Sequence, residues 1–478
     1  MNKKIRTYNI IFYSIIAASF IFILLSNPFL IQLYDPWRYH LQCIASFYNG
    51  GSEGTLWHQM WANVFKIIGI NNIFTWAKII HVFQFSLAAV IVFYFSKTVL
   101  TILIKSPLTT PLPTEPTPAP LPKGDSEGFP TSPVRKDISN GASGNDSNQI
   151  DELSTIQIKF LSLLAVFLWF IGNGTFSVEY QQAWIMWYSV TYQGLSIPLL
   201  WYSTALTLKI FYEDLTSKEI IFYIAQIAVA SLLLARIHPS ELIYYLIHIP
   251  IIFLISIKWL IKSKNTKILF FYAPIMFLLM FIVLKYFTSY KGRTYKVPLF
   301  EIISSGENIG QILQKINGLG HVIVSGWNRF PNSFSEIAII SLIAMIIFRV
   351  NYLFTKDKDI SFNRNVFDVL LVLSLLFFLI PMVPFLAGLA GYLTNAGVVW
   401  RFFFASPWFI FLPFLIYRIL TMKEIHIPLY KLIIILILIL FSIASFHKYF
   451  SLKYTITNTK SIITSLDKEK VGVRYQKL

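Results

Sequence analysis

The sequence YNIIFYSIIAASFIFILLSNPFLIQL, from Tyr8 to Leu33, is a long apolar segment, and Asp35-Pro36-Trp37-Arg38-Tyr39-His40 follows it almost directly. About 20 apolar residues are enough for a helix to cross the hydrocarbon core of a membrane. A carboxylate, a guanidinium and an imidazole therefore stand at the edge of a predicted span. Pro36 suits the first turn of a helix, which places Asp35 at or near its N-cap. An interfacial anchor with an ordinary cap would also explain this motif.

The composition of the chain predicts a polytopic, all-α membrane protein. Of its 478 residues, 55% are hydrophobic and only 13% are charged, which is far from the composition of soluble domains. The net charge of +17 indicates contact with lipid headgroups and phosphate-bearing lipids. No basic tract alternates with aromatic residues in a soluble module, so we expect no nucleic-acid partner. The expected location is the bacterial inner membrane, as a multi-pass protein.

Apolar runs of span length recur along the whole chain. The second and ninth runs are long enough to tilt or break, and the ninth contains Pro381 and Pro384. The runs predict about eleven spans, at 8–33, 73–104, 155–172, 183–211, 219–235, 241–261, 267–288, 336–355, 365–388, 402–421 and 428–448.

Clusters of Lys and Arg orient these spans, because such clusters favour the cytoplasmic side. The clusters are Lys3, Lys4 and Arg6; Lys258, Lys262, Lys264 and Lys267; Arg349, Lys356, Lys358 and Arg364; and Arg418, Lys423 and Lys431. With eleven spans, all four clusters fall on one side, so we expect the N-terminus inside and the C-terminus outside. The predicted outer loop 289–335 is basic and does not follow this rule, but long loops cross the membrane largely regardless of their charge.

The predicted organisation has four parts. Residues 1–105 hold spans one and two with a long first external loop, 34–72. Residues 106–152 are rich in Pro, Thr, Gly and Ser and are expected to form a disordered cytoplasmic linker. Residues 153–448 hold spans three to eleven with the large external loop 289–335, and 449–478 form a short external tail.

This topology brings acids, histidines and arginines to one face of the membrane. Ionisable groups at such positions are costly and are usually functional. A base, phosphate-binding cations and potential metal ligands suit the transfer of a group from a lipid phosphate. The candidate catalytic residues are Asp35, His40 and Glu179, and the candidate substrate-binding residues are Arg38, Arg236, His238, Glu241, Arg293, Arg329 and Arg401. Each residue also has an ordinary explanation, as an anchor, a turn or a solvated loop charge.

Leu33-Tyr34-Asp35-Pro36-Trp37-Arg38-Tyr39-His40 resembles the first external loop of oligosaccharyltransferase catalytic subunits, which carries an Asp-Pro-Trp motif. Those subunits belong to the GT-C superfamily of membrane glycosyltransferases. The resemblance implies an odd span count in many members, an inside N-terminus, an amphipathic helix in that loop and an essential acid just after span one. Asp35 fills the position of the acid. Residues 36–72 could supply the helix, with Trp57, Trp61, Phe65 and Ile68 at roughly helical spacing.

The resemblance implies a glycosyltransferase that takes a sugar from a polyprenyl-phosphate donor to a glycan, glycolipid or other external acceptor. Asp35 would be the base, and Arg293, Arg329 and Arg401 would hold the lipid phosphate. The chain lacks a Trp-Trp-Asp-Tyr-Gly motif and an external C-terminal domain, which argues against protein N-glycosylation. A lone Glu179 replaces a paired-acid motif in the second loop. The use of a divalent cation, Mg²⁺ or Mn²⁺, is therefore left open, and no other cofactor is expected.

Two alternatives stay open at this point. A polysaccharide polymerase or ligase would act on lipid-linked glycans through arginines and histidines of the large outer loop, without needing Asp35. A transporter or flippase for a lipid-linked glycan would need repeat symmetry and helices broken at mid-membrane, and the sequence has no internal repeat.

Overall fold

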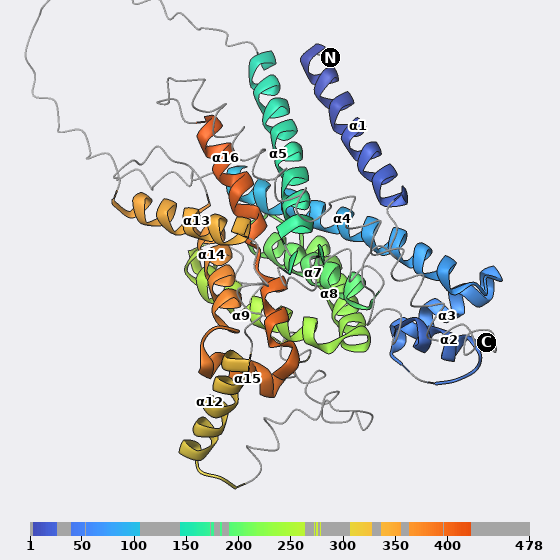
Figure 1. The fold of residues 1–478 in the computed structure, drawn as a ribbon. Coiled ribbons are helices and arrows are strands. Elements are labelled where there is room, and N and C mark those ends of the chain that lie inside the picture. Colours follow the sequence, from blue (N-terminus) through green and yellow to red (C-terminus); the bar gives the residue numbers. More distant parts are fainter. Residues whose placement is uncertain are drawn as a thin grey trace, which may run out of the picture.

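A computed structural model shows a helical protein in which most helices gather into one bundle (Figure 1). The structure describes residues 3–25, 40–52, 54–105, 144–172, 174–175, 182–183, 191–262, 272, 274–275, 278, 306–326, 336–354, 363–394 and 396–421. In the first half, the elements are α1 (Lys3–Leu25), α2 (Leu41–Tyr48), α3 (Leu56–Ile68), α4 (Ile73–Lys105), α5 (Gly144–Gly172), β1 (Gly174–Thr175) and β2 (Gln182–Ala183). The two short strands pair antiparallel, with Gly174 opposite Ala183.

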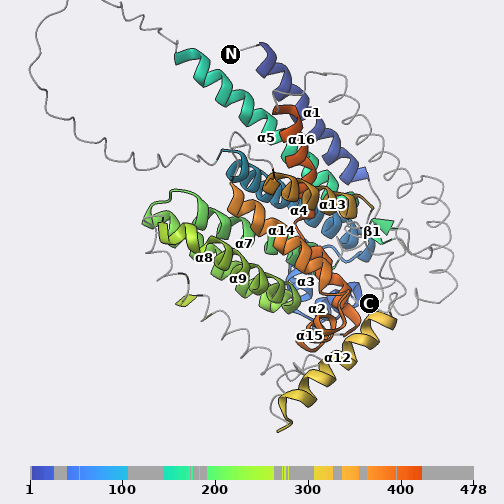
Figure 2. The same ribbon diagram turned by 90° about the vertical axis from the view of Figure 1, so that its left-hand side faces the viewer.

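The second half continues the bundle with helices of varied length. They are α7 (Gln193–Tyr212), α8 (Ser217–Ile237), α9 (Pro239–Lys262), α12 (Ile309–Gly326), α13 (Glu336–Phe354), α14 (Arg364–Leu379), α15 (Pro384–Leu393), the 3₁₀ segments η4 (Ala396–Ala405) and η5 (Trp408–Ile410), and α16 (Phe411–Thr421). Helices α7, α8 and α9 run side by side (Figure 2). The fold class is therefore all-α, as the composition predicts.

Local sequence signals explain where several of these helices begin. Thr216 caps α8, because its hydroxyl accepts from the amide of Glu219 while the Glu219 carboxylate accepts from the amide of Thr216. Pro239 opens α9 directly after the last turn of α8, at a position where a missing amide hydrogen costs nothing. The connection between these two helices is consequently tight, and it holds His238 at the junction.

Four of the described helical stretches are long and apolar enough to cross a membrane: Thr75–Ile104, Ser217–Ile237, Pro239–Ile257 and Val399–Ile419. The pair α14 and α15 would add a fifth if it forms one bent span. Large apolar side chains of α8, such as Ile221 and Phe222, are more than half exposed, as lipid-facing residues would be. These features are compatible with an integral membrane protein.

The ninth predicted span, which we expected to tilt or break, is broken. Helix α14 ends at Leu379, α15 begins at Pro384, and the two axes differ by 88°. Pro384 takes the start of the new helix, because proline there leaves no backbone donor unpaired.

The prediction of about eleven spans goes beyond the four or five that the described part of the chain supports. The predicted spans 155–172 and 336–355 correspond to shorter apolar helices, Thr155–Phe170 and Ala338–Asn351. The predicted span 428–448 and most of 267–288 lie outside the described residues.

Two predicted boundaries differ from the helices that are seen. Helix α5 begins at Gly144, so it includes the last part of the predicted linker 106–152, and 106–143 lie outside the described residues. The predicted outer loop 289–335 contains α12, which packs against α15. The predicted tail 449–478 also lies outside the described residues.

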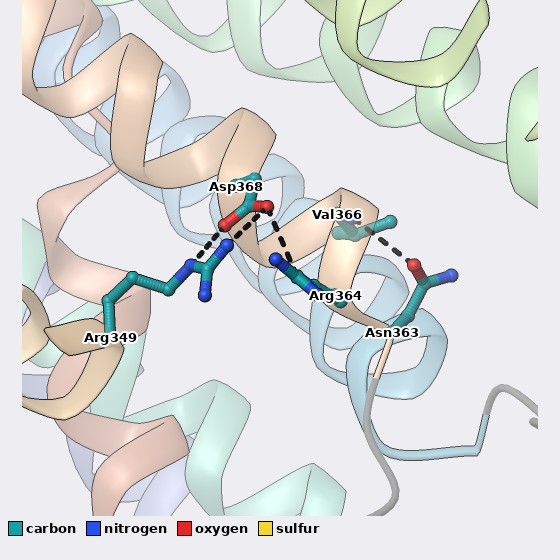
Figure 3. A network of polar contacts seen from close by, with 5 residues as sticks. All are labelled: Arg349, Asn363, Arg364, Val366 and Asp368. Atoms are coloured by element: carbon teal, nitrogen blue, oxygen red, sulfur yellow. Dashed lines mark hydrogen bonds and ion pairs between the residues drawn. The ribbon is translucent and has the colours of Figure 1, made fainter. Parts of the chain in front are cut away.

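A carboxylate clamp joins α13 and α14 (Figure 3). Arg349 donates from Nε and Nη2 to the two oxygens of Asp368, over 2.7 and 3.0 Å. Arg364 lies one turn before Asp368, with its Nε 3.8 Å from the second oxygen. The side-chain oxygen of Asn363 caps α14 by accepting from the backbone amide of Val366. The backbone amide of Asn363 donates to the carbonyl of Leu103. The start of α14 is thus tied to the end of α4.

Candidate functional site

A cluster of polar and aromatic side chains lies at the other end of α4, where α2 and α3 pack against its first turns. We call it the histidine cluster; it consists of His40, His58, Tyr192, His238 and Glu241, with Arg401 close enough to act on His40 electrostatically. Four segments contribute: the α2–α3 pair, the residue before α7, the α8–α9 junction and η4.

Helices α2 and α3 form a small platform with an apolar core of its own. Trp57, Trp61 and Phe65 are buried in this core, whereas Ile68 is 56% exposed. The platform packs on the first turns of α4 and on Ile237 at the end of α8. The predicted apolar stripe of α3 is therefore correct for Trp57, Trp61 and Phe65 and wrong for Ile68. Within 36–72 the structure has two helices, α2 and α3, and the turn after α2 has Gly50 at φ 90°.

The start of α3 fixes the ring of His58. Thr55 is the N-cap, and its backbone amide donates to His58 Nδ1 over 2.9 Å, while its hydroxyl lies 3.1 Å from the same nitrogen. This is a capping box in which a histidine replaces the usual Glu or Gln. Gly54 precedes it at φ 129°, and a Cβ at that position would lie 2.8 Å from His58 Nδ1. The ring is consequently held by backbone geometry.

His40 and His58 form a buried pair. Nδ1 of His40 and Nε2 of His58 are 3.0 Å apart, and the two rings are nearly parallel. Burial, and then unfavourable electrostatic interactions with His58, Arg401 and His238, keep the pKa of His40 well below its usual value. Burial lowers the pKa of His58 to about 3. Both rings are therefore neutral at pH 7.

His238 and Glu241 form a second buried pair at the α8–α9 junction. His238 ends α8 in an extended conformation, and Glu241 lies in the first turn of α9. Nδ1 of His238 and Oε2 of Glu241 are in hydrogen-bond contact, and both side chains are almost fully buried. A carboxylate in the first turn of a helix interacts favourably with the helix dipole, and its burial requires a partner of this kind.

Tyr192 connects the two pairs. Its ring stacks on that of His238, with ring centres 4.3 Å apart, and lies roughly perpendicular to that of His40, with ring centres 4.7 Å apart. Gln84 of α4 fixes the neighbouring backbone, because it accepts from Trp57 Nε1 and donates to the carbonyl of Thr191. The platform, α4 and the start of α7 are therefore held together around one aromatic ring.

The two arginines among the described candidates have different surroundings. The guanidinium of Arg401 lies 5.4 Å from the ring centre of Trp400 in η4, and its charge contributes to the lowered pKa of His40. Arg236, in the last turn of α8, is exposed, whereas His238 two residues later is buried. The structure thus associates Arg401 with the cluster and leaves Arg236 at the surface.

The other nominated residues lie outside the described part of the chain, namely Asp35, Arg38, Glu179, Arg293 and Arg329. Among the described residues, no group of three or more His, Cys, Asp or Glu side chains is arranged to hold a metal ion. Since Asp35 and Glu179 lie outside that part, the use of a divalent cation stays a prediction.

Sequence reasoning assigned no role to two residues of the cluster. For His58, the Thr55-x-x-His58 spacing of a capping box is the signal in the sequence that points to a fixed ring. Tyr192 fell inside the predicted span 183–211, where one aromatic residue resembles any other. Comparison of the chain with protein-family models, with curated proteins and with solved structures gives no match.

Proposed function

We propose that this protein is a GT-C-like membrane glycosyltransferase that transfers a sugar from a polyprenyl-phosphate donor to a glycan, glycolipid or other external acceptor. One observation supports it most: His40, the pair His238 and Glu241, and Arg401 come from three separate segments, yet they gather at one end of an apolar helical bundle. A platform of two short helices flanks them there. The proposal includes about eleven spans, an inside N-terminus and an outside C-terminus in the bacterial inner membrane.

The chemistry is an exchange of two bonds at the anomeric carbon. Asp35 takes the proton of the acceptor hydroxyl, and the acceptor oxygen then bonds to the anomeric carbon. The bond between that carbon and the phosphate oxygen breaks, and the polyprenyl phosphate leaves with the electron pair. Arg401, together with Arg293 and Arg329, would stabilise the departing phosphate, because a guanidinium matches phosphate oxygens and keeps its charge.

The decisive experiment is transfer from a labelled polyprenyl-phosphate sugar by the purified protein. We expect Asp35→Asn to lower turnover by about 100-fold or more, the scale of a lost general base. Arg401→Lys should weaken donor binding, since the planar donor geometry is lost. Arg364→Lys is the matched control, because Arg364 lies away from the candidate site. It is the first residue of α14, and Asn363 before it bonds to Leu103 at the opposite end of α4. An Asp35→Asn protein with near-normal turnover would contradict the assignment.

A second candidate function is transport of a lipid-linked glycan. The 88° break between α14 and α15 favours it, because discontinuous helices often form the substrate sites of transporters. Proteoliposomes distinguish the two functions. Movement of a labelled lipid-linked glycan between leaflets, with no new glycosidic bond, would support the transporter.

A further inference from the structure

We infer that His58 holds His40 as a neutral ring with its proton on Nε2, so that His40 serves the substrate as a hydrogen-bond donor and leaves the role of base to another residue. The substrate part of this inference rests on the proposed function. The proton placement rests only on contacts among Thr55, His58 and His40.

The first step concerns His58. A backbone amide can only donate, and that of Thr55 points at His58 Nδ1 over 2.9 Å. His58 Nδ1 must therefore offer its lone pair. A neutral imidazole carries one proton, so the proton of His58 is on Nε2. The hydroxyl of Thr55, 3.1 Å away, can donate to the same lone pair.

The second step concerns the hydrogen bond between His58 and His40. His58 Nε2 and His40 Nδ1 are 3.0 Å apart, and a hydrogen bond holds only one proton between them. That proton belongs to His58, so His40 Nδ1 accepts it. A second proton on Nδ1 would face the first directly. The burial of the pair and the nearby charge of Arg401 also disfavour a cationic His40.

The consequence is a defined role for His40. With Nδ1 occupied, its only proton is on Nε2, and that nitrogen cannot accept one. A donor of fixed direction can stabilise an oxygen that gains negative charge in the transition state. The substrate atom that would accept from His40 Nε2 is an oxygen of the lipid-phosphate sugar, either on the phosphate or on the sugar. His58 is then a positioning residue, since it acts on the substrate only through His40.

Two substitutions at position 58 separate proton placement from packing. Both Gln and Glu suit the third position of a capping box, so either can accept from the Thr55 amide. Gln keeps the direction of the hydrogen bond from residue 58 to His40, because its amide nitrogen can donate to His40 Nδ1. Glu reverses the direction of that hydrogen bond, because both of its carboxylate oxygens accept. His58→Gln and His58→Glu thus differ by one donor in a similar volume.

The measurement is nitrogen NMR of the full chain in lipid bilayers, with labelled histidine. The chain has 8 histidines, and an His40→Asn difference spectrum identifies the signals of His40. We expect the natural protein and His58→Gln to show a neutral His40 protonated at Nε2. His58→Glu should show a proton on Nδ1 and a raised pKa of His40. A natural protein with His40 protonated at Nδ1, or charged at pH 7, would overturn the inference.

Turnover gives the second readout, and it separates this inference from the proposed function. We expect His58→Glu to be about 100-fold slower than His58→Gln, the effect of misdirecting one transition-state donor. Equal turnover in the two variants would overturn the donor role. The expected spectra with no transfer by any variant would uphold the proton placement and contradict the proposed function. If His58→Glu does not fold, the spectrum of the natural protein alone still decides the tautomer.

Discussion

Tyr192 lies flat against His238, with ring centres 4.3 Å apart and planes only 21° apart. Its ring lies roughly perpendicular to that of His40, with ring centres 4.7 Å apart. Tyr192 precedes α7, His238 ends α8, and His40 precedes α2, so one ring connects three segments. The α2–α3 platform is thereby coupled to the bundle through the candidate site.

Replacing Tyr192 tests this coupling. Tyr192→Ala should lower both the thermal midpoint and the turnover, because aromatic contacts contribute about 0.5–1.5 kcal/mol each beyond their buried area. Tyr192→Phe keeps both ring contacts and is the matched control. Thermal unfolding in detergent and the transfer assay measure the two effects. Equal behaviour of the Ala and Phe variants would show that the ring contacts carry no coupling.

The buried histidines predict a pH dependence of stability. Burial lowers the pKa of His58 from 6.5 to about 3, and it lowers that of His40 as well. Between those values the unfolded chain binds more protons than the folded chain, so acid favours unfolding. Stability should be full above about pH 6.5 and fall below it, by about 1.4 kcal/mol per pH unit for each such group.

Thermal unfolding from about pH 8 to about pH 5 measures this loss. His58→Gln removes one titrating group while keeping the capping acceptor, so its midpoint should fall less steeply with acid. A variant with the same slope as the natural protein would show that His58 is not the group that titrates.

Local patterns in the sequence predicted the parts of the fold that depend on neighbouring residues. The spacing of Trp57, Trp61 and Phe65 predicts α3, and Pro381 with Pro384 indicates a span that tilts or breaks, as it does before α15. The structure also brings His40 and His238 together, since both rings contact Tyr192, whereas their placement on one face of the membrane stays a prediction. Periodicity and proline geometry are local properties, which explains this agreement.

Helix α12 shows what was missed although a signal was present. Asn308 and Gln311 form a capping box, and Ile309, Ile316 and Ile323 recur at helical spacing behind it. These residues fall in a basic segment between apolar runs of span length, so a search for such runs alone does not find the helix. Contacts across the fold, such as Tyr192 on His238, leave no such local trace.

The clamp between Arg349 and Asp368 predicts a stability effect at the far end of the bundle (Figure 3). Arg349→Lys cannot donate from two nitrogens to both carboxylate oxygens, so it should destabilise the protein by about 1 kcal/mol. Arg364→Gln should change stability by less than about 0.5 kcal/mol, because Arg364 is mostly exposed and 3.8 Å from Asp368. Thermal unfolding compares them, and an unchanged Arg349→Lys midpoint would contradict the clamp.

The contact of α12 with α15 depends on two glycines. A Cβ on Gly320 would lie 1.6 Å from the carbonyl oxygen of Pro384, and one on Gly388 would lie 1.8 Å from that of Ile316. The two backbones therefore touch, and an added methyl group must push the helices apart. Because α15 also packs against η4, which carries Arg401, a displaced α15 should disturb the candidate site as well.

Gly320→Ala should accordingly destabilise the protein by about 1–3 kcal/mol and weaken binding of the lipid-phosphate donor. Gly318→Ala is the matched control on the same helix, because a Cβ there meets nothing within 4 Å. That control should be neutral or slightly stabilising, since Ala favours a helix over Gly by about 1 kcal/mol. Thermal unfolding and donor titration measure both variants. A Gly320→Ala protein as stable as Gly318→Ala would mean that α12 does not touch α15 in the membrane.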